Sequence, residues 1–588
     1  MPTANIEKMR EPIKVALGEA PADLAIVNGS IVNAYTSKVL AGDTVLIKGA
    51  KIAYVGKDAV KRARQLLSQE QGPVIKDWGG KLPIALIYPN SYYIGMSNLG
   101  IHAIYSLLNS YSDVVCERAF WEREGRTQQI PVLSLESQRP LSDFAVLAFS
   151  ITYELDYFNV VQILKASGIP LYAADRTERH PLVIAGGPCI TTNPLPLSPF
   201  FDCLCIGEAE PILPAMLPVL SEGIKGKRDD LLKELAALPG IYVPQYRPET
   251  PVVRQWARNL DDFPVASAIL TPNTELGDLY LIEVERGCNW GCRFCLVSQA
   301  FCPMRFRSID KLLAQAELGL KYRKRLGLLG AIVTEHPQIE ELLVRLRQMG
   351  AGLSISSLRV KPLSQIVLEQ LAKGGAETIT LAPEAGSQRL RQLIKKGISE
   401  EDILEAVDKV AGQGIKQLKL YFMIGLPAET DEDIEEIIDL TLRAKSILDR
   451  RRSGCRLTIN IAPFVPKAGT PFQWLPMAPL DTLNHHLSIL KNSLPAKGIR
   501  IKCESPAWSE VQAVLSRGDT ELAGVLANIE DLSLSGWRKA VEKCQVDVDF
   551  YAHQRWETTK KLRWSMIDLG TEPEKLELEL VEAISQAH

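Results

Sequence analysis

Three cysteines stand within eight residues of one another in the segment ERGCNWGCRFCLVSQ. Cys288, Cys292 and Cys295 form a C-x3-C-x2-C pattern, and a short loop with this spacing can turn three thiolates toward one centre. Gly287 and Gly291 allow the tight backbone turns that such a loop needs. Since clustered thiolates bind zinc or iron-sulfur clusters, the pattern predicts a metal centre.

The number of ligands separates the two kinds of metal. Structural zinc sites are closed by four Cys or His ligands, so zinc would need a fourth ligand such as Cys302 or His336. Three thiolates alone match an iron-sulfur cube with one iron left open. We favour the cluster and keep two alternatives, a zinc-stabilised nucleic-acid-binding module and a catalytically inactive Fe-S electron-transfer protein.

Composition narrows the class of protein. The chain has 588 residues, 46% hydrophobic and 23% charged, which is typical of a globular protein with several domains. The net charge of -3 indicates no overall basic field for nucleic acid or membrane. The N-terminus lacks the apolar run of a signal peptide, and no stretch has the length and apolar character of a membrane span. We therefore expect a cytoplasmic protein with reduced cysteines.

Apolar strand-like and helical segments alternate around the cysteine loop. The first strand runs directly into the loop, and a helix with Ser308 as its N-cap follows it. This strand-and-helix unit recurs, which predicts a parallel partial barrel. The predicted strands are residues 279–285, 326–333, 353–360, 377–384, 416–427 and 455–466.

The motif CNWGCRFC, with Phe294 before the last cysteine, resembles the signature of the radical S-adenosylmethionine enzymes. The resemblance implies that Cys288, Cys292 and Cys295 hold a [4Fe-4S] cluster whose fourth iron binds S-adenosylmethionine. It also implies a (β/α)6 partial TIM barrel and a reductant such as flavodoxin or ferredoxin. An electron from the cluster would cleave S-adenosylmethionine to methionine and a deoxyadenosyl radical, in an oxidoreductase or transferase of unknown substrate.

The ends of the strands suggest the remaining contacts of the cofactor. Thr334 and Glu335 follow the second strand, where this family usually has a Gly-Gly-Glu motif that binds the substrate amino group. APEAGSQRLR resembles the ribose-contacting segment, with Glu384 and Ser387 as polar candidates, and YFMIGLPAET resembles the adenine-contacting segment, with Gly425.

Each of these contacts has a structural alternative. Ser387 could be a helix N-cap, and Gly425 could serve a plain strand-to-helix turn. The neighbouring Lys395 and Lys396 could reach a cofactor carboxylate, but paired lysines more often lie on a solvated face.

A second α/β unit precedes the barrel and resembles the cobalamin-binding-like Rossmann domain, doubly wound, of many radical S-adenosylmethionine enzymes. The D-x-H-x-x-G motif that supplies a histidine to cobalt is absent from the sequence, so cobalamin and a retained empty domain stay open as alternatives. Its thiols could bind a second cluster, although buried inert thiols are favoured. The strands are predicted at 83–89, 143–151, 169–176, 181–188 and 202–210, and the thiols are Cys116, Cys189, Cys203 and Cys205.

The two ends of the chain complete the domain plan. Residues 21–56 alternate apolar and polar residues between turn signals, which resembles the opening β-segment of amidohydrolases without their H-x-H metal pair. The segments SPAWSEVQAVLSRGD and LRWSMIDLG resemble the C-terminal part of an uncharacterised Fe-S oxidoreductase family. The predicted domains are a β-hairpin extension (1–75), a cobalamin-binding-like Rossmann domain (80–225), a linker (226–275), the radical S-adenosylmethionine core (276–475) and a helical C-terminal domain (476–588).

Overall fold

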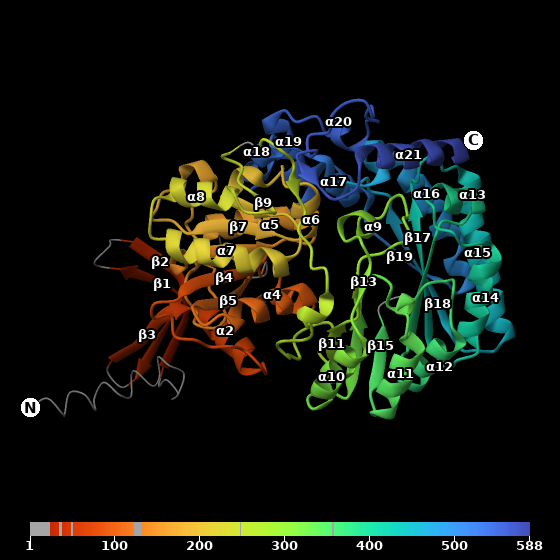
Figure 1. Ribbon diagram of the computed structural model, residues 1–588, viewed down its shortest axis with the longest axis horizontal. Helices are drawn as coiled ribbons and strands as arrows, with labels where there is room; N and C mark the ends of the chain where they lie inside the picture. The colour runs from red at the N-terminus through yellow and green to blue at the C-terminus, as the bar shows by residue number, and fades with distance from the viewer. Residues whose placement is uncertain are drawn as a thin grey trace, which may run out of the picture.

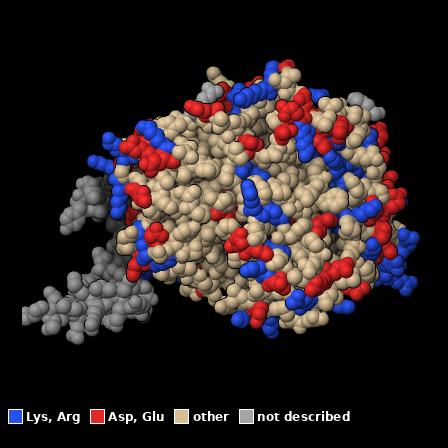
Figure 2. Space-filling view, in the orientation of Figure 1, with Lys and Arg blue, Asp and Glu red and all other residues tan. Residues whose placement is uncertain are grey.

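The computed structural model describes residues 24–33, 38–48, 51–122, 132–246, 248–355 and 358–587. Two α/β units lie side by side, and helices of the C-terminal region run across the top of both (Figure 1). No helix in the described ranges is long and apolar enough to cross a bilayer. On the face shown in Figure 2, acidic and basic side chains are interspersed and lie mostly toward the rim.

The first unit is a six-stranded sheet with the strand order β5-β4-β6-β7-β8-β9, parallel except for β9. This is the predicted doubly wound Rossmann-like domain. Its strands are β4 (Leu82–Tyr88), β5 (Val114–Phe120), β6 (Val146–Ser150), β7 (Leu182–Gly186), β8 (Cys203–Cys205) and β9 (Ile241–Tyr242). Its main helices are α4 (Leu99–Ser110), α5 (Tyr157–Ala166), α7 (Ala209–Gly223) and α8 (Arg228–Ala236).

One predicted strand of this unit is wrong. Residues 169–176 form an irregular segment that ends in a short 3-10 helix, Ala173–Asp175. The buried guanidinium of Arg176 accounts for this, because it donates hydrogen bonds to the carbonyls of Pro170 (3.0 Å) and Leu171 (2.9 Å). A strand would have to offer these carbonyls to a neighbouring strand. The sheet instead gains β5, which sequence reasoning missed.

The predicted linker at 226–275 is also not a linker. Helix α8 and strand β9 complete the Rossmann-like unit, and β10 (Val252–Val253) pairs in parallel with β20 (Ile567–Asp568) near the end of the chain. The C-terminal region is therefore tied to the segment between the two units.

The second unit is the predicted partial barrel. A three-stranded sheet, β11-β14-β15, and a four-stranded sheet, β16-β17-β18-β19, are parallel throughout and are joined by a bridge between Leu358 and Leu381. All six predicted strands are present. The strands are β11 (Leu279–Glu283), β14 (Arg325–Leu329), β15 (Gly352–Ile355), β16 (Thr378–Glu384), β17 (Gln417–Ile424), β18 (Arg456–Pro463) and β19 (Arg500–Cys503).

Helices cover the outer side of the barrel, as Figure 1 shows for the green and cyan part of the chain. Ser308 caps α10 as predicted, since its hydroxyl accepts a hydrogen bond from the Lys311 amide. The helices are α10 (Ile309–Leu320), α11 (Ile339–Gln348), α12 (Gln365–Lys373), α13 (Gln388–Leu393), α14 (Glu400–Ala411), α15 (Asp431–Arg450) and α16 (Leu480–Ser493).

The region after residue 475 is mainly helical, as predicted, but it also supplies β19 to the barrel sheet. The sheet therefore ends later in the chain than the proposed core boundary. The remaining helices are α17 (Pro506–Arg517), α18 (Leu522–Asn528), α19 (Leu534–Cys544), α20 (Val548–Ala552) and α21 (Pro573–Ala587).

The N-terminal extension contains antiparallel strands, as predicted, in the order β1 (Leu24–Asn33), β2 (Lys38–Lys48) and β3 (Lys51–Lys57). Residues 1–23 of this predicted domain lie outside the described ranges. The following helix α2 (Asp58–Ser68) leads into Glu70, which forms a fully buried ion pair with Arg118 of β5 (2.6 Å). The extension therefore ends near residue 57, and the residues up to 75 belong to the Rossmann-like unit.

This boundary predicts two different truncations. Removing residues 1–57 should leave the thermal unfolding midpoint nearly unchanged. Removing residues 1–75 should destabilise the protein by about 3 kcal/mol or more, because Arg118 would lose one of its buried carboxylate partners. The matched full-length control is Glu70→Gln, which should reproduce most of the loss; equal stability of both truncations would contradict the assignment.

Candidate functional site

The three motif cysteines lie on a loop that two short strands close. Strand β12 (Glu285–Arg286) pairs antiparallel with β13 (Arg305–Phe306), and the intervening residues 287–304 form the loop at the end of β11. Gly287 has a φ of +96°, and a Cβ there would come within 2.4 Å of the Phe301 carbonyl oxygen. The turn that sequence reasoning assigned to this glycine is therefore a steric requirement.

The thiols themselves are removed from water. Cys288 and Cys292 are buried and Cys295 is half-buried. Burial raises the pKa of Cys292 to about 11, although the Lys396 ammonium opposes this shift. Burial also raises the pKa of Cys295, against the backbone amides of Val297 and Ser298, which donate to its sulfur. The donor set is three neighbouring soft ligands in a low-dielectric pocket, which suits an iron-sulfur cluster.

The two candidates for a fourth zinc ligand are already engaged with the backbone. The Cys302 thiol donates to the carbonyls of Ser298 (2.7 Å) and Cys288 (3.2 Å). His336 is buried, with Nε2 donating to the Arg307 carbonyl (2.8 Å) and Nδ1 accepting from the Gln338 amide (3.1 Å). Within the described ranges, no three His, Cys, Asp or Glu side chains are arranged to hold a single metal ion.

Polar groups without hydrogen-bond partners lie at the end of β14. The buried Thr334 Oγ1 and one carboxylate oxygen of Glu335 have no hydrogen-bond partner in the structure. Glu335 lies 3.6 Å from the guanidinium of Arg359, which stacks on the ring of Trp290 in the cysteine loop. An amino group bound beside Cys288 would find acceptors here, as the sequence comparison with Gly-Gly-Glu implied.

Glu384 ends β16 in the left-handed region, with a φ of +70°. Its carboxylate pairs with Lys396 at 2.9 Å. Burial alone would lower the pKa of Lys396, but Glu384 and Cys292 raise it above its ordinary value. Lys396 therefore lies at the cysteines and not on a solvated face, whereas Lys395 points to Glu579 of α21.

The other two predicted contacts have structural roles. Ser387 is buried; its hydroxyl caps α13 by accepting from the Leu390 amide and donates to Asp433 (2.5 Å). Gly425 has a φ of +75°, and its amide donates to Glu429. Its backbone is available to a ligand only on the side away from Leu483, where a Cβ would come within 2.5 Å of that side chain.

Sequence reasoning missed two further residues at this site. Arg359 follows β15, and a charged residue at the carboxyl end of a barrel strand was a usable signal. Glu285 directly precedes the loop; it accepts a hydrogen bond from the Ile332 amide (2.5 Å), and its second oxygen is buried without a partner. Burial raises the pKa of Glu285 to about 7.

The cysteine loop is anchored from two directions. Arg293, between two of the cysteines, is buried and donates to Glu579 (3.0 Å), Glu582 (3.1 Å) and Gln586 (2.9 Å) of α21. On the other side, the β12–β13 hairpin contacts the Rossmann-like unit. There Glu208 accepts hydrogen bonds from Arg286 (2.8 Å) and from the two terminal nitrogens, Nη2 and Nη1, of Arg305 (2.7 and 3.0 Å).

Two parts of the chain match known protein families. Residues 100–244 match the family model for the N-terminal region of radical SAM proteins, and residues 282–441 match the radical SAM superfamily model. Uncharacterized protein MJ0966 of Methanocaldococcus jannaschii is 33% identical over 453 residues, which is 75% of this chain and 90% of that protein. The chain belongs to the radical SAM superfamily. It is thus an enzyme of a superfamily whose members bind a [4Fe-4S] cluster and S-adenosylmethionine.

Two further similarities are more distant. The uncharacterized methyltransferase PH0819 of Pyrococcus horikoshii is 26% identical over 282 residues, covering 45% of this chain and 58% of that protein. The radical S-adenosylmethionine methyltransferase TsrM from Kitasatospora setae, solved with cobalamin and a [4Fe-4S] cluster, is 14% identical with a TM-score of 0.50. That match covers 79% of this chain and 99% of TsrM, and it supports the fold.

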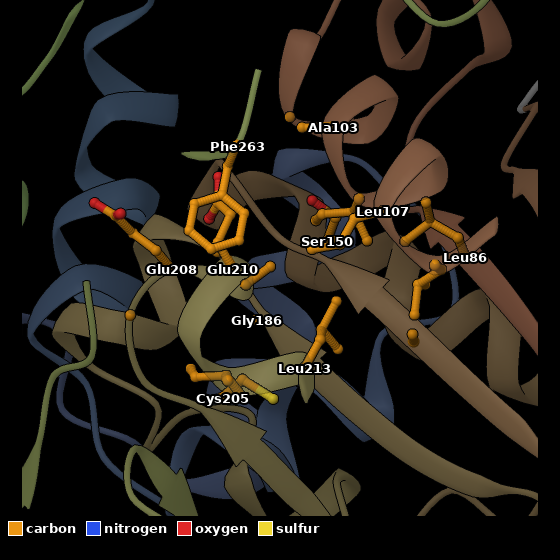
Figure 3. A pocket seen from close by; sticks show the side chains of 18 of the residues that line it. Leu86, Ala103, Leu107, Ser150, Gly186, Cys205, Glu208, Glu210, Leu213 and Phe263 are labelled. Carbon is orange, nitrogen blue, oxygen red and sulfur yellow. The ribbon is translucent and has the colours of Figure 1, made fainter. Parts of the chain in front are cut away.

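This radical SAM protein has a cavity of about 550 Å³ in its Rossmann-like unit (Figure 3). Leu86, Leu107 and Leu213 give it an apolar interior between the sheet, α4 and α7. At the carboxyl ends of the strands lies Gly187, whose φ is +111°; a Cβ there would come within 2.4 Å of the Ile151 carbonyl oxygen. Glycine is therefore required here because the Ile151 backbone packs closely against this position.

The mouth of the cavity reaches the barrel unit. Phe263, Arg286 and Phe301 line it there, so the cavity meets the hairpin that carries the cysteine loop. Glu208 and Glu210 lie at the same end, as Figure 3 shows. The cavity is thus an apolar space that opens toward the predicted cluster.

His102, a histidine of the Rossmann-like unit, has a structural role and offers no free nitrogen to cobalt. His102 on α4 is 2% exposed; its Nδ1 accepts from the Ile269 amide (3.3 Å), and its Nε2 donates to the Met96 carbonyl (3.1 Å). Both nitrogens are engaged, and His102 does not line the cavity.

The four thiols of the Rossmann-like unit do not converge. Cys116 lies on β5, at the opposite edge of the sheet from β8, which carries Cys203 and Cys205. Burial raises the pKa of Cys116, Cys189 and Cys203 well above the ordinary value and that of Cys205 to about 12. These thiols are packed as small apolar groups.

His102 predicts a pH dependence of stability. Burial lowers its pKa to about 4, below the ordinary value of 6.5, so the unfolded chain takes up this proton more readily. The contribution of neutral His102 to the free energy of unfolding, up to about 3 kcal/mol, is fully present above pH 6.5 and is lost as the pH falls toward 4. Between pH 7.5 and pH 4.5, the thermal unfolding midpoint of the cluster-free protein should fall less for His102→Gln than for the wild type. The control variant His180→Gln should behave like the wild type. If the midpoint of His102→Gln fell as much as that of His180→Gln, the prediction would be wrong.

Proposed function

We propose that Cys288, Cys292 and Cys295 bind a [4Fe-4S] cluster with which this enzyme cleaves S-adenosylmethionine reductively. The observation that carries the proposal is the position of three thiols, two buried and one half-buried, on one loop at the barrel mouth, while Cys302 and His336 are satisfied by the backbone. A cluster bound there supplies the electron for cleavage and an open iron for the amino-acid end of S-adenosylmethionine.

The surrounding charges match the two ends of that cofactor. The Thr334 hydroxyl, which has no hydrogen-bond partner, and the Glu335 carboxylate, 3.6 Å from Arg359, offer acceptors to its amino group. Arg359 and Lys396 offer cations to its carboxylate. The Glu384 carboxylate, held in the left-handed backbone region beside Lys396, is the ribose contact that the sequence suggested. We assign the adenine contact to the backbone around Gly425.

We also propose cobalamin as a second cofactor and methyl transfer as the reaction class. The cavity in the Rossmann-like unit is apolar inside and reaches the hairpin and the cysteine loop, since Arg286 and Phe301 are among its lining residues. Open α/β sheets bind cofactors in such a place, at the carboxyl ends of their parallel strands. In the described part of the chain no histidine lines the cavity, so cobalamin would bind without a histidine from this protein.

A one-electron donor such as flavodoxin or ferredoxin is the partner we infer, because the cluster must be reduced before each cleavage. The first experiment below separates this proposal from an iron-sulfur protein that does not cleave S-adenosylmethionine and from a zinc module.

Protein prepared without oxygen should bind about four irons and, once reduced, convert S-adenosylmethionine to deoxyadenosine. Cys292→Ala should lose both properties because the cluster loses a ligand. Cys302→Ala is the matched control, since its thiol contacts only carbonyls, and it should retain both. Iron without cleavage would favour the electron-transfer protein, and zinc without iron would refute the proposal.

The cobalamin proposal has its own test. Wild-type protein incubated with hydroxocobalamin and freed of unbound corrin should retain cobalt with an altered visible spectrum. Ala103→Trp, which fills the cavity from α4, should abolish retention while Ala103→Ser preserves it. Iron content reports folding of the barrel in both variants. Full iron loading with little cobalt in the wild type would remove cobalamin from the mechanism.

A further inference from the structure

The inner face of the barrel sheet carries an unexplained group of polar residues. Lys419 on β17 is paired in register with Thr380 on β16 and Thr458 on β18. Two residues further along, Tyr421 pairs with Asn460. Because registered residues on neighbouring parallel strands share a face, these side chains all point to the same side of the sheet.

That side is the interior of the barrel. The alternate residues Leu418 and Leu420 are fully buried in the core, which includes Ile403 of α14 and Ile434 of α15. Tyr421 is 39% exposed although it lies within β17, so the space in front of it is open. The helices lie on the outer side only (Figure 1).

A polar network lies at the start of the inner face of the sheet. Gln417, at the start of β17, donates to Thr458 (2.9 Å) and accepts from Thr378. The inner faces of β17, β18 and β19 form one surface in register, the barrel wall.

The charges on this wall are not balanced. On β19, Arg500 is in register with Thr458, and Lys502 is in register with Asn460. Within the described ranges, Lys419, Arg500 and Lys502 form no ion pair; Lys419 is half-buried, whereas Arg500 and Lys502 are exposed on the edge strand. Glu384 of β16 is in register with Phe422, not with Lys419 or Tyr421, and its carboxylate is paired with Lys396. Lysines often protect edge strands such as β19, but Lys419 lies between two paired strands and protects no edge.

An unpaired acceptor accompanies these cations. The side-chain oxygen of Asn460 is buried and has no hydrogen-bond partner in the structure. A half-buried ammonium and a buried orphan carbonyl on adjacent strands are both costly unless a ligand or water satisfies them. Together they specify a ligand with a negative charge and a hydrogen-bond donor.

We propose that this wall binds the substrate of the radical reaction through an anionic group, a carboxylate or a phosphate. Lys419, Arg500 and Lys502 bind the anion, and Asn460 accepts a hydrogen bond from an N–H or O–H of the same molecule. Lys419 precedes Gly425, the proposed adenine contact, by six residues, about 20 Å of strand, so the site lies deeper than the contacts proposed for S-adenosylmethionine. The inference rests on the proposed function in one respect, because it takes the bound anion to be part of the substrate of the radical reaction.

Pyridoxal 5′-phosphate tests this site on the full-length, cluster-loaded protein without turnover. Its aldehyde condenses with a lysine amine and releases water, and borohydride reduces the resulting imine to a stable amine that mass spectrometry locates. Lys419 should be labelled about tenfold faster than Lys416, an exposed lysine paired with Glu377 at the start of the same strand. Inorganic pyrophosphate should protect Lys419 but not Lys416.

Further arms isolate the anion. Pyridoxal, which lacks the phosphate, should label both lysines at similar rates, and the double variant Arg500→Gln/Lys502→Gln should slow labelling of Lys419 by about tenfold. Equal labelling of Lys419 and Lys416 by the phosphate ester overturns the proposal. Protection of Lys419 by S-adenosylmethionine alone also overturns it, because the anion would then be the cofactor's carboxylate. Loss of deoxyadenosine formation in wild type would instead fault the proposed function and leave the labelling result intact.

Discussion

The structure depends on the buried ion pairs that hold the β12–β13 hairpin. Glu208 comes from the Rossmann-like unit, and Arg286 and Arg305 come from the two strands of the hairpin. Burial alone would raise the pKa of Glu208, but the two guanidinium groups lower it below its ordinary value. Buried charges are tolerated only when fully paired, so the carboxylate fixes the hairpin in one position relative to the first unit.

This single constraint brings two ligand spaces together. The cavity of the Rossmann-like unit opens beside Arg286, and the cysteine loop begins one residue later at Gly287. On the other side of the loop, Arg293 is held by carboxylates of α21 from the end of the chain. The loop is therefore positioned by carboxylates 78 residues earlier than Arg286 and 286 residues later than Arg293, and neither carboxylate lies in the cysteine motif.

The charges around the thiols follow a common arrangement. Two ion pairs lie at the strand ends near the thiols, Glu335 with Arg359 and Glu384 with Lys396. In our proposal these residues exchange partners with the cofactor, so that a zwitterionic amino acid binds without leaving a buried charge unpaired. The cations of the barrel wall form no ion pair within the described ranges, and we propose that this difference separates substrate contacts from cofactor contacts.

The sequence by itself determined the local features of this protein. The spacing of Cys288, Cys292 and Cys295 with Gly287 predicts a metal-binding loop, because three thiols so close in the chain can converge through local turns. Apolar periodicity predicted the six barrel strands from neighbouring residues alone. It failed at residues 169–176, where Arg176 is held by Asp202 and by the Phe200 carbonyl, 26 and 24 residues away.

Tertiary structure decided which residues meet. That Ser387 caps a helix, that Lys396 lies beside Cys292, and that His102 and His336 are satisfied by backbone groups depends on contacts between elements far apart in the chain. The same holds for Glu70, whose buried partner Arg118 lies 48 residues away and moves a domain boundary. No local pattern encodes such contacts, because burial and pairing arise only when the sheets and helices pack.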